Sequence, residues 1–492
     1  MKSIFQKTYL LSLALLITLS ASLSAQNLFF ERVYDETLAQ ASYVIANTQT
    51  KEAIVIDAQR DIDIYLDMAK KHDFTITKVT ETHIHADFLC GSRELVAATG
   101  AALYLSEEGG EDWQYEFPHL PLKDGSQLQL GNIQLDVMHT PGHTPESITF
   151  ILTDGTSQPA KAITGDFIFV GDLGRPDLLE KAAGHVGSQE VGAKQLYASL
   201  MRFVELPDNT EIWPAHGAGS FCGKSLSTVP NSTLKDEKIS SKAFSFLNDE
   251  EGFVKYILAD QPSPPMYFAK MKYLNKVSRP LLVEVPKHSE LSKSSADRAI
   301  ANNLIVIDTR HKSEVAKGHI PGSLHIENGS KFSTYMGSLM DYEQQFILVA
   351  EEDAIEDLTR KLMRIGMDNI YGYISSVENQ SLALETSAVV DMSTFENYLA
   401  SDNVQIIDVR TEGEFSDGHI KGVDNIVLAS LDRSLDKISK DKPVIVYCKS
   451  GARASLAYSY LRQQGFDNIM NYVGGINEWL EHNKELVQSD IQ

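Results

Sequence analysis

Cysteine is scarce in this chain of 492 residues, which contains only Cys90, Cys222 and Cys448. Exported proteins that are held together by disulfides are dense in cysteine, so three thiols exclude a disulfide scaffold. An odd number of cysteines also leaves at least one thiol free. A free thiol fits either chemistry at sulfur or an inert side chain in the core.

Positive charge is also in short supply. The 44 lysines and arginines are outnumbered by 67 aspartates and glutamates, which gives a formal net charge of -23 at pH 7. Proteins that bind nucleic acid need clustered lysine and arginine to neutralise phosphates. The composition therefore argues against a nucleic-acid partner.

Long hydrophobic runs are missing as well. The apolar run from Tyr9 to Leu19 follows Lys2 and Lys7 and leads into small residues that end at Ala25. Such a run is too short to span a membrane comfortably, but it matches the apolar core of a secretory signal peptide. We therefore predict that residues 1–25 are a signal peptide, that the protein is exported to the periplasm, and that no membrane segment remains after cleavage. An uncleaved membrane anchor is the alternative.

The sequence does contain histidines and carboxylates at the ends of apolar runs. The run that ends at Thr80 is followed by His83, His85 and Asp87. Alternating residues of an extended segment point the same way, so these three side chains can share one face and converge on a cation. Three later apolar runs lead to potential ligands in the same manner, at His143, Asp166 and His216. Buried imidazoles and carboxylates need partners that offset their desolvation, so the set predicts a metal site.

The order and spacing of these motifs resemble the metallo-β-lactamase superfamily, whose fold is an αββα sandwich. The motifs are His-x-His-x-Asp at 83–87, Pro-Gly-His-Thr at 141–144, Thr-Gly-Asp at 164–166 and Pro-Ala-His at 214–216. Dinuclear hydrolases of that family carry a histidine directly after the first aspartate, where this chain has Phe88. Because an apolar ring cannot bind a metal, one metal is favoured. The branch that works with one metal is the persulfide dioxygenases, and the resemblance implies one Fe(II) per chain held by His83, His143 and Asp166.

The expected chemistry agrees with this ligand set. Two imidazoles and one carboxylate on one face of Fe(II) leave open positions where a substrate sulfur and O2 can bind side by side. Tetrahedral zinc with the same ligands would leave one position for a hydrolytic water. We then expect His85, Asp87 and His216 to orient the ligands or to face the substrate.

Two loops close to these motifs contain further candidates. Arg175 lies in a loop rich in glycine and proline past Asp166, and its guanidinium could bind a carboxylate of a thiol carrier. A surface arginine without a role is the alternative. Cys222 lies in a glycine-rich loop after His216. The resemblance to dioxygenases fused to rhodanese domains implies that Cys222 holds or relays sulfur near the metal, and a structural thiol is the alternative.

The second half of the chain contains an internal repeat with an offset of one hundred positions. Leu304–Arg310 is matched by Val404–Arg410, and Gly318-His319-Ile320 by Gly418-His419-Ile420. Two copies of one domain are the simplest explanation. Each copy resembles rhodanese, a compact α/β sulfurtransferase with a parallel sheet.

Only the second copy carries a thiol where the chemistry is expected. An apolar strand ends at Cys448 and continues into Lys449, Ser450, Gly451, Ala452 and Arg453, followed by a helical run. Converging backbone N–H groups, the helix dipole and the two cationic side chains favour a thiolate, so we predict that Cys448 is a nucleophile that carries a persulfide beside Arg453. The first copy has Val349 or Ala350 at that position and acidic residues after it, so we interpret it as a spacer.

The sequence thus predicts an α/β protein in several parts. We expect a metallo-β-lactamase domain at 27–245, a linker with packing helices at 246–285, and rhodanese-like domains at 286–385 and 389–490. The resemblance implies oxidation of a glutathione-like thiol persulfide by O2 to sulfite, which the persulfide of Cys448 converts to thiosulfate. A dinuclear zinc thioester hydrolase of the glyoxalase II kind and a non-catalytic scaffold are the alternatives. A homodimer is left open.

Overall fold

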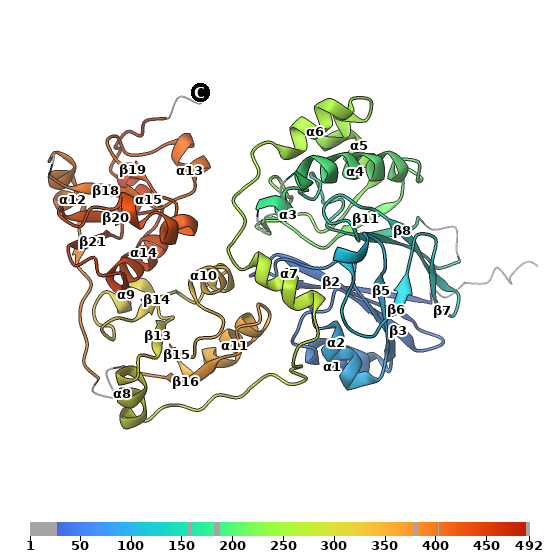
Figure 1. The fold of residues 1–492 in the computed structure, drawn as a ribbon, viewed down its shortest axis with the longest axis horizontal. Helices are drawn as coiled ribbons and strands as arrows, with labels where there is room; N and C mark the ends of the chain where they lie inside the picture. Colours follow the sequence, from blue (N-terminus) through green and yellow to red (C-terminus); the bar gives the residue numbers. More distant parts are fainter. Residues whose placement is uncertain (1–26, 156–158, 182–186, 378–381, 402, 489–492) are drawn as a thin grey trace, which may run out of the picture.

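The computed structural model describes residues 27–155, 159–181, 187–377, 382–401 and 403–488. The predicted signal peptide, residues 1–25, lies outside these ranges. Within them, no helix has both the length and the apolar character that crossing a membrane requires. Figure 1 shows the N-terminal half, coloured blue to green, on one side of the molecule and two smaller α/β units, yellow to red, on the other.

The N-terminal half is built on two sheets of six strands each. The first sheet has the order β1-β2-β3-β4-β5-β6, with β1 (Leu28–Asp35), β2 (Gln40–Asn47), β3 (Glu52–Ile56), β4 (Thr75–Thr80), β5 (Ala102–Ser106) and β6 (Leu120–Leu122). The second has the order β12-β11-β10-β9-β8-β7, with β7 (Gln127–Leu130), β8 (Ile133–His139), β9 (Ile148–Thr153), β10 (Lys161–Gly165), β11 (Glu211–Pro214) and β12 (Ser232–Thr233).

Helices cover the outer faces of both sheets. The α-helices of this half are α1 (Asp63–His72), α2 (Ser92–Thr99), α3 (Leu178–Lys181), α4 (Ser188–Phe203), α5 (Leu234–Ser240) and α6 (Glu250–Leu258). Along β2, Tyr43 and Ile45 pack between the sheets, whereas Val44 and Ala46 pack in the cluster that holds α1 and α2. This split arises because an extended strand turns successive side chains to opposite faces. The four layers confirm the αββα sandwich that the motifs predict.

The C-terminal half repeats a small parallel sheet. The first copy has the strand order β14-β13-β15-β16 and the second β17-β21-β20-β18-β19. The first contains β13 (Ile305–Asp308), β14 (Leu324–His325), β15 (Phe346–Val349) and β16 (Ile370–Ile374), with α8 (Lys293–Ala301), α9 (Lys312–Val315), α10 (Phe332–Leu339) and α11 (Ile355–Met363). The second contains β17 (Val389–Val390), β18 (Gln405–Asp408), β19 (Asp424–Asn425), β20 (Val444–Tyr447) and β21 (Ile469–Tyr472), with α12 (Met392–Leu399), α13 (Glu412–Asp417), α14 (Ala452–Gln463) and α15 (Gly475–Glu481).

The same internal ion pair occurs in both copies. Arg310 binds Asp308 and donates to the carbonyl of Gly318 at 2.8 Å. Its counterpart Arg410 binds Asp408 and donates to the Gly418 carbonyl at the same distance. Short 3-10 helices complete the fold, at η1 (Glu111–Trp113), η2 (Ala243–Phe246), η3 (Glu352–Ala354), η4 (Leu428–Arg433) and η5 (Leu435–Lys437).

The segment between the halves is part of the packed fold. Helix α7 (Phe268–Lys276) buries Phe268 and Met271 in one hydrophobic cluster with Leu89 of the N-terminal half and Leu362 of α11. Burial of large apolar side chains on both sides stabilises this junction by removing their surface from water. The predicted linker therefore acts as a shared core element.

Charged pairs join the first copy to the N-terminal half. Arg364 donates to Asp61 at 2.7 Å and to Asp35 at 2.9 Å, and Arg60 donates to both oxygens of Asp368 at 2.7 and 2.9 Å. Asp61 and Asp35 are buried, so these pairs are shielded from solvent. Breaking a pair of this kind leaves an uncompensated charge in the interior, which is costly.

The opposite face of the first copy contacts the second copy. His325 of β14 has its Nδ1 2.7 Å from the hydroxyl of Ser455, and its backbone N–H donates to the hydroxyl of Ser459 at 2.9 Å. Both serines belong to α14, the helix that follows Cys448. The first copy thus packs against both neighbours, as expected of a spacer.

Candidate functional site

Ends of four strands deliver the candidate ligands to one place. β4 leads into the loop with His83, β8 into the loop with His143, β10 into Asp166, and β11 into His216. β10 and β11 are parallel neighbours, with Gly165 opposite Pro214, so Asp166 and His216 leave the second sheet side by side. Because β4 belongs to the first sheet, the site lies where the two sheets meet at one edge.

The structure brings His83, His143 and Asp166 together. One ligand atom from each lies within 4.8 Å of the others. Nε2 of His143 is 3.4 Å and Nε2 of His83 is 3.9 Å from Oδ2 of Asp166. All three side chains are buried, and neither Nε2 of His83 nor the two oxygens of Asp166 have a hydrogen-bond partner among the described residues. Buried acceptors without partners fit a cation that none of the described side chains supplies.

Hydrogen bonds fix the ring tautomers so that Nε2 faces the centre. Nδ1 of His143 donates to the carbonyl of Arg175 at 3.0 Å. The Thr82 hydroxyl donates to Asp57 and therefore accepts from Nδ1 of His83, which is 3.0 Å away. Burial lowers the pKa of His143 to about 3 and holds the pKa of His83 well below its ordinary value. Both imidazoles are therefore neutral and present a lone pair to the centre.

A second group lies against the first and shares Asp166. Ligand atoms of Asp87, His216 and Cys222 are also within 4.8 Å of one another. Nε2 of His216 is 3.3 Å from Asp87 and 3.4 Å from Oδ1 of Asp166, while its Nδ1 donates to the Ala39 carbonyl at 2.9 Å. Burial, reinforced by Asp166 and Asp87, raises the pKa of the Cys222 thiol well above its ordinary value. Asp87, His216 and Cys222 thus border the centre directly.

His85 belongs to neither group of ligand atoms. Its Nε2 lies 3.0 Å from Oδ1 of Asp57, and its ring packs against Phe88 with centroids 4.4 Å apart. Burial acts to lower the pKa of His85, but the carboxylates of Asp57, Asp87 and Glu81 together outweigh it and raise that pKa to about 9. Phe88 is fully buried, so the apolar ring beside His85 is shielded from solvent.

Arg175 corrects one expectation. Its side chain is fully buried, and its guanidinium donates to both oxygens of Asp177, at 2.7 and 2.8 Å, and to the carbonyls of Phe221 and Pro262. It is neither a surface residue nor free to hold a substrate carboxylate. Arg175 instead ties together the loop that supports His143 and the loop that carries Cys222. The sequence misled because two of the partners, the carbonyls of Phe221 and Pro262, come from distant segments.

Two residues that position the centre carry no motif. Asp57, at the end of β3, accepts from the backbone N–H of Thr82 at 2.7 Å as well as from His85. Asn275 of α7 donates to the carbonyls of His85, at 2.9 Å, and Phe88, at 2.7 Å. Both hold the ligand loop in place. An isolated buried asparagine in a helix gives no signal in sequence, whereas Asp57 ends an apolar strand as the other site residues do.

Cys448 occupies the position that the repeat predicts. It follows β20, is buried, and its Sγ accepts from the backbone N–H of Gly451 at 3.1 Å, at the start of α14. Gly451 has a φ of +94°, which a residue with a side chain rarely adopts. Arg453 forms a two-pronged ion pair with Glu414, at 2.6 and 2.8 Å, while Lys449 and Ser450 are exposed.

The strand register decides which residue replaces Cys448 in the first copy. Asp308 pairs with Val349 in that copy, and Asp408 pairs with Tyr447 in the second. Val349 therefore corresponds to Tyr447, and Ala350 takes the cysteine position. The methyl side chain of Ala350 cannot form a persulfide.

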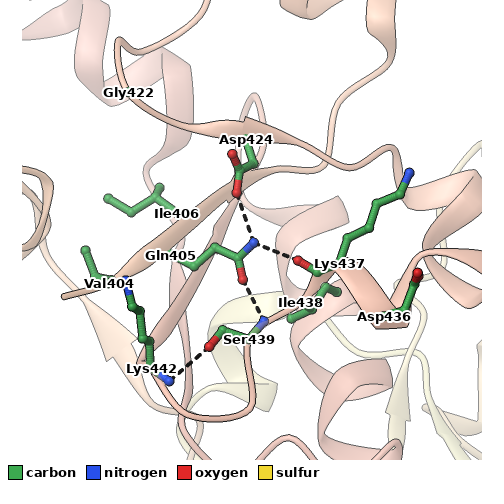
Figure 2. A pocket seen from close by; sticks show the side chains of 10 residues that line it. All are labelled: Val404, Gln405, Ile406, Gly422, Asp424, Asp436, Lys437, Ile438, Ser439 and Lys442. Atoms are coloured by element: carbon green, nitrogen blue, oxygen red, sulfur yellow. Dashed lines mark hydrogen bonds between the residues drawn. The ribbon is translucent and has the colours of Figure 1, made fainter. Parts of the chain in front are cut away.

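A cavity of about 230 Å³ opens beside Cys448 between the two copies. The second copy contributes Cys448, Ser450 and Arg453 to its wall, and the first contributes Glu327, Lys331 and Tyr335. Figure 2 shows a different hollow of about 430 Å³ on the second copy, where Gln405 donates to Asp424 and to the Lys437 carbonyl and accepts from the Ser439 N–H. Those side-chain bonds occupy Gln405 within the protein, and the thiol is not part of that hollow.

Known proteins match both halves. The metallo-beta-lactamase superfamily model matches residues 36–216, and the rhodanese-like domain model matches 289–379 and 391–482. A persulfide dioxygenase ETHE1 from Bos taurus is 26% identical over 46% of this chain and 81% of its own, and a hydroxyacylglutathione hydrolase from a Polaromonas species is 30% identical over 45% and 82%. The crystal structure of a metallo-beta-lactamase from Staphylococcus aureus is 41% identical, covers 70% of this chain and 99% of its own, and has a TM-score of 0.66.

Proposed function

Since the chain belongs to the metallo-beta-lactamase superfamily and carries two rhodanese-like domains, we propose that it is an iron-dependent persulfide dioxygenase joined to a sulfurtransferase. The observation that carries the proposal is the buried trio of His83, His143 and Asp166, whose acceptor atoms face one point. Iron(II) bound there would supply adjacent positions for a persulfide sulfur and O2. The likeness to a persulfide dioxygenase supports the same reaction class.

The residues around the trio prepare the site for this chemistry. Neutral His83 and His143 offer lone pairs, and Asp166 supplies negative charge that a divalent cation would balance. Buried Phe88 packs its apolar ring on His85, which would help to exclude water from a reactive sulfur. The net reaction turns the persulfide R-S-SH, O2 and water into the thiol, sulfite and protons.

Cys448 carries the second half of the proposal. Its thiolate takes the outer sulfur of another persulfide and releases the thiol, which leaves a persulfide on Sγ. Sulfite then bonds to that outer sulfur, the S–S bond breaks, and its electron pair stays on Sγ of Cys448 as thiosulfate leaves. The Gly451 N–H at 3.1 Å stabilises the sulfur anion at the start and end of the cycle.

The proposal extends to the location of the protein. The predicted signal peptide supports export to the periplasm.

A thioester hydrolase with two zinc ions is the second candidate. It is favoured by the group of Asp87, His216 and Cys222, which shares Asp166 with the trio, and by the likeness to a hydroxyacylglutathione hydrolase. Phe88 speaks against it, because the dinuclear pattern of the family has a histidine at that place.

Metal analysis together with O2 uptake distinguishes the two candidates. For the dioxygenase we expect about one iron per chain and O2 consumption when glutathione persulfide is added, with sulfite as product. Protein that is fully loaded with iron and does not consume O2 would refute the proposal. About two zinc ions per chain with hydrolysis of a glutathione thioester would establish the second candidate instead.

A further inference from the structure

The cavity beside Cys448 has two walls, and only one of them belongs to the domain that carries the thiol. Lys331, Tyr335 and Glu327 of the first copy and Cys448 and Arg453 of the second line the same cavity of about 230 Å³. That volume is large enough for a small oxyanion with water. Neither copy alone would enclose the thiol, so a first copy without cysteine still shapes the place where sulfur is transferred.

Three charged side chains line the cavity, and one of them, Arg453, is already engaged by opposite charge through two hydrogen bonds to Glu414. Glu327 has Nε2 of His311 3.8 Å from one carboxylate oxygen, and its other oxygen is buried without a hydrogen-bond partner among the described residues. No carboxylate lies within ion-pair distance of the Lys331 ammonium in the part of the chain that the structure describes. Lys331 is therefore the cation of this cavity that has no carboxylate partner among the described residues.

Contacts with the N-terminal half fix the position of the Lys331 side chain. Its ammonium donates to the Gly219 carbonyl at 2.8 Å and lies 5.2 Å from the ring centroid of Phe221, both in the loop that carries Cys222. A lysine ammonium has three N–H donors, so this contact leaves two for a ligand. Burial lowers the pKa of the Lys331 ammonium below its ordinary value.

We propose that Lys331 is the anion-binding residue of the Cys448 site and holds the incoming sulfite, so that the first copy is a working half of the sulfurtransferase. This inference rests on the proposed function. A small dianion beside Cys448 would balance the ammonium and accept its two spare hydrogens. Tyr335 of α10, on the same side of the cavity as Lys331, adds a hydroxyl. Binding of the anion needs no metal ion. The first copy is then more than the spacer that its missing cysteine suggests.

The test measures only the second half-reaction, in which sulfite takes the outer sulfur of the Cys448 persulfide. Full-length protein is loaded with sulfur on Cys448 by glutathione persulfide without O2, and mass spectrometry verifies one added sulfur atom. Sulfite is then added at increasing concentration, and thiosulfate is measured in a single turnover. Absence of persulfide or thiosulfate in the wild type would refute the proposed sulfur transfer itself, which separates that failure from a failure of the Lys331 assignment.

We expect Lys331→Met to raise the sulfite concentration at half-maximal rate by about tenfold or more, with the rate at saturating sulfite largely kept. Lys331→Arg should restore most of the affinity, because it returns the charge. Lys317→Met, at an exposed lysine of the same copy, is the matched control and should behave like the wild type.

Two results would overturn the assignment. One is an unchanged sulfite dependence in Lys331→Met. The other is equal loss in Lys331→Met and Lys331→Arg, because packing against Gly219 rather than charge would then be responsible. If Lys331→Met proves unstable, Lys331→Gln retains a donor for Gly219 without the charge and is held to the same expectation.

Discussion

Replacing Asp57 with asparagine should weaken the metal centre without removing a ligand. Oδ1 of Asp57 accepts from the Thr82 N–H at 2.7 Å and from His85 at 3.0 Å, and Oδ2 accepts from the Thr82 hydroxyl at 2.9 Å, which in turn orients His83. Asparagine keeps the size and tolerates the φ of +55° at this position. It removes the charge and turns one acceptor into a donor. Loss of such an orienting contact typically lowers metal affinity by about 10- to 100-fold.

The same change has a calculable effect on the stability of the metal-free protein. The pKa of His85 rises from 6.5 to about 9, chiefly through Asp57 acting against burial. This difference corresponds to about 3 kcal/mol. Because the folded pKa lies above the unfolded one, the stabilisation is complete below pH 6.5 and is lost as the pH rises through 9. Asp57→Asn should therefore cost up to about 3 kcal/mol near pH 6 and much less above about pH 10.

Urea unfolding of metal-free protein at these two pH values measures the stability, and competition with a chelator measures iron affinity. Asp73→Asn is the matched control, since Asp73 has a φ of +56° at the exposed end of α1. It should leave both quantities unchanged. An Asp57→Asn protein with the wild-type iron affinity and the wild-type stability near pH 6 would show that this reasoning is wrong.

Three other substitutions test separate parts of the molecule. Cys448→Ser should abolish thiosulfate formation and leave O2 uptake intact, and loss of both activities would contradict the independence of the two sites. Asp166→Ala should remove iron, and the metal content after dialysis against a chelator measures it; retained iron would show that Asp166 is not a ligand. Arg364→Met should lower the free energy of unfolding by about 3 kcal/mol, chiefly because buried Asp35 loses its ion-pair partner, whereas Asp61 keeps Arg360. Arg298→Met, without an ion pair to lose in the described structure, is its control in urea unfolding.

Much of the fold could be predicted from sequence because the signals are local. Apolar runs that stop at His or Asp mark strand ends, and an offset of one hundred positions exposes the duplicated domain. Residues at strand ends on one edge of a sheet are close in space, which predicts that His83, His143, Asp166 and His216 lie together, and the resemblance to the persulfide dioxygenases implies His83, His143 and Asp166 as the ligands. The sequence left Val349 and Ala350 open as the counterpart of Cys448, and the strand register of the structure selects Ala350.

The remainder depends on contacts between distant segments. The sequence made Arg175 a candidate for substrate binding. Its guanidinium instead donates to the carbonyls of Phe221 and Pro262, and no local sequence pattern predicts these contacts. Asn275 reaches the ligand loop only because α7 packs there. Lys331 was not predicted for another reason. Its cavity lies between the two copies, and the sequence of either copy alone does not show that both contribute residues to the walls.

The spread of the ligands along the chain also bears on how the protein matures. A growing chain exposes His83 early, but Asp166 and His216 follow only after most of the second sheet has been made. His83 follows a strand of the first sheet, whereas His143 and Asp166 follow strands of the second, so the trio is complete only once both sheets have formed. Under the proposed function, metal loading would therefore come after folding of this half, and protein folded without a metal could be loaded afterwards.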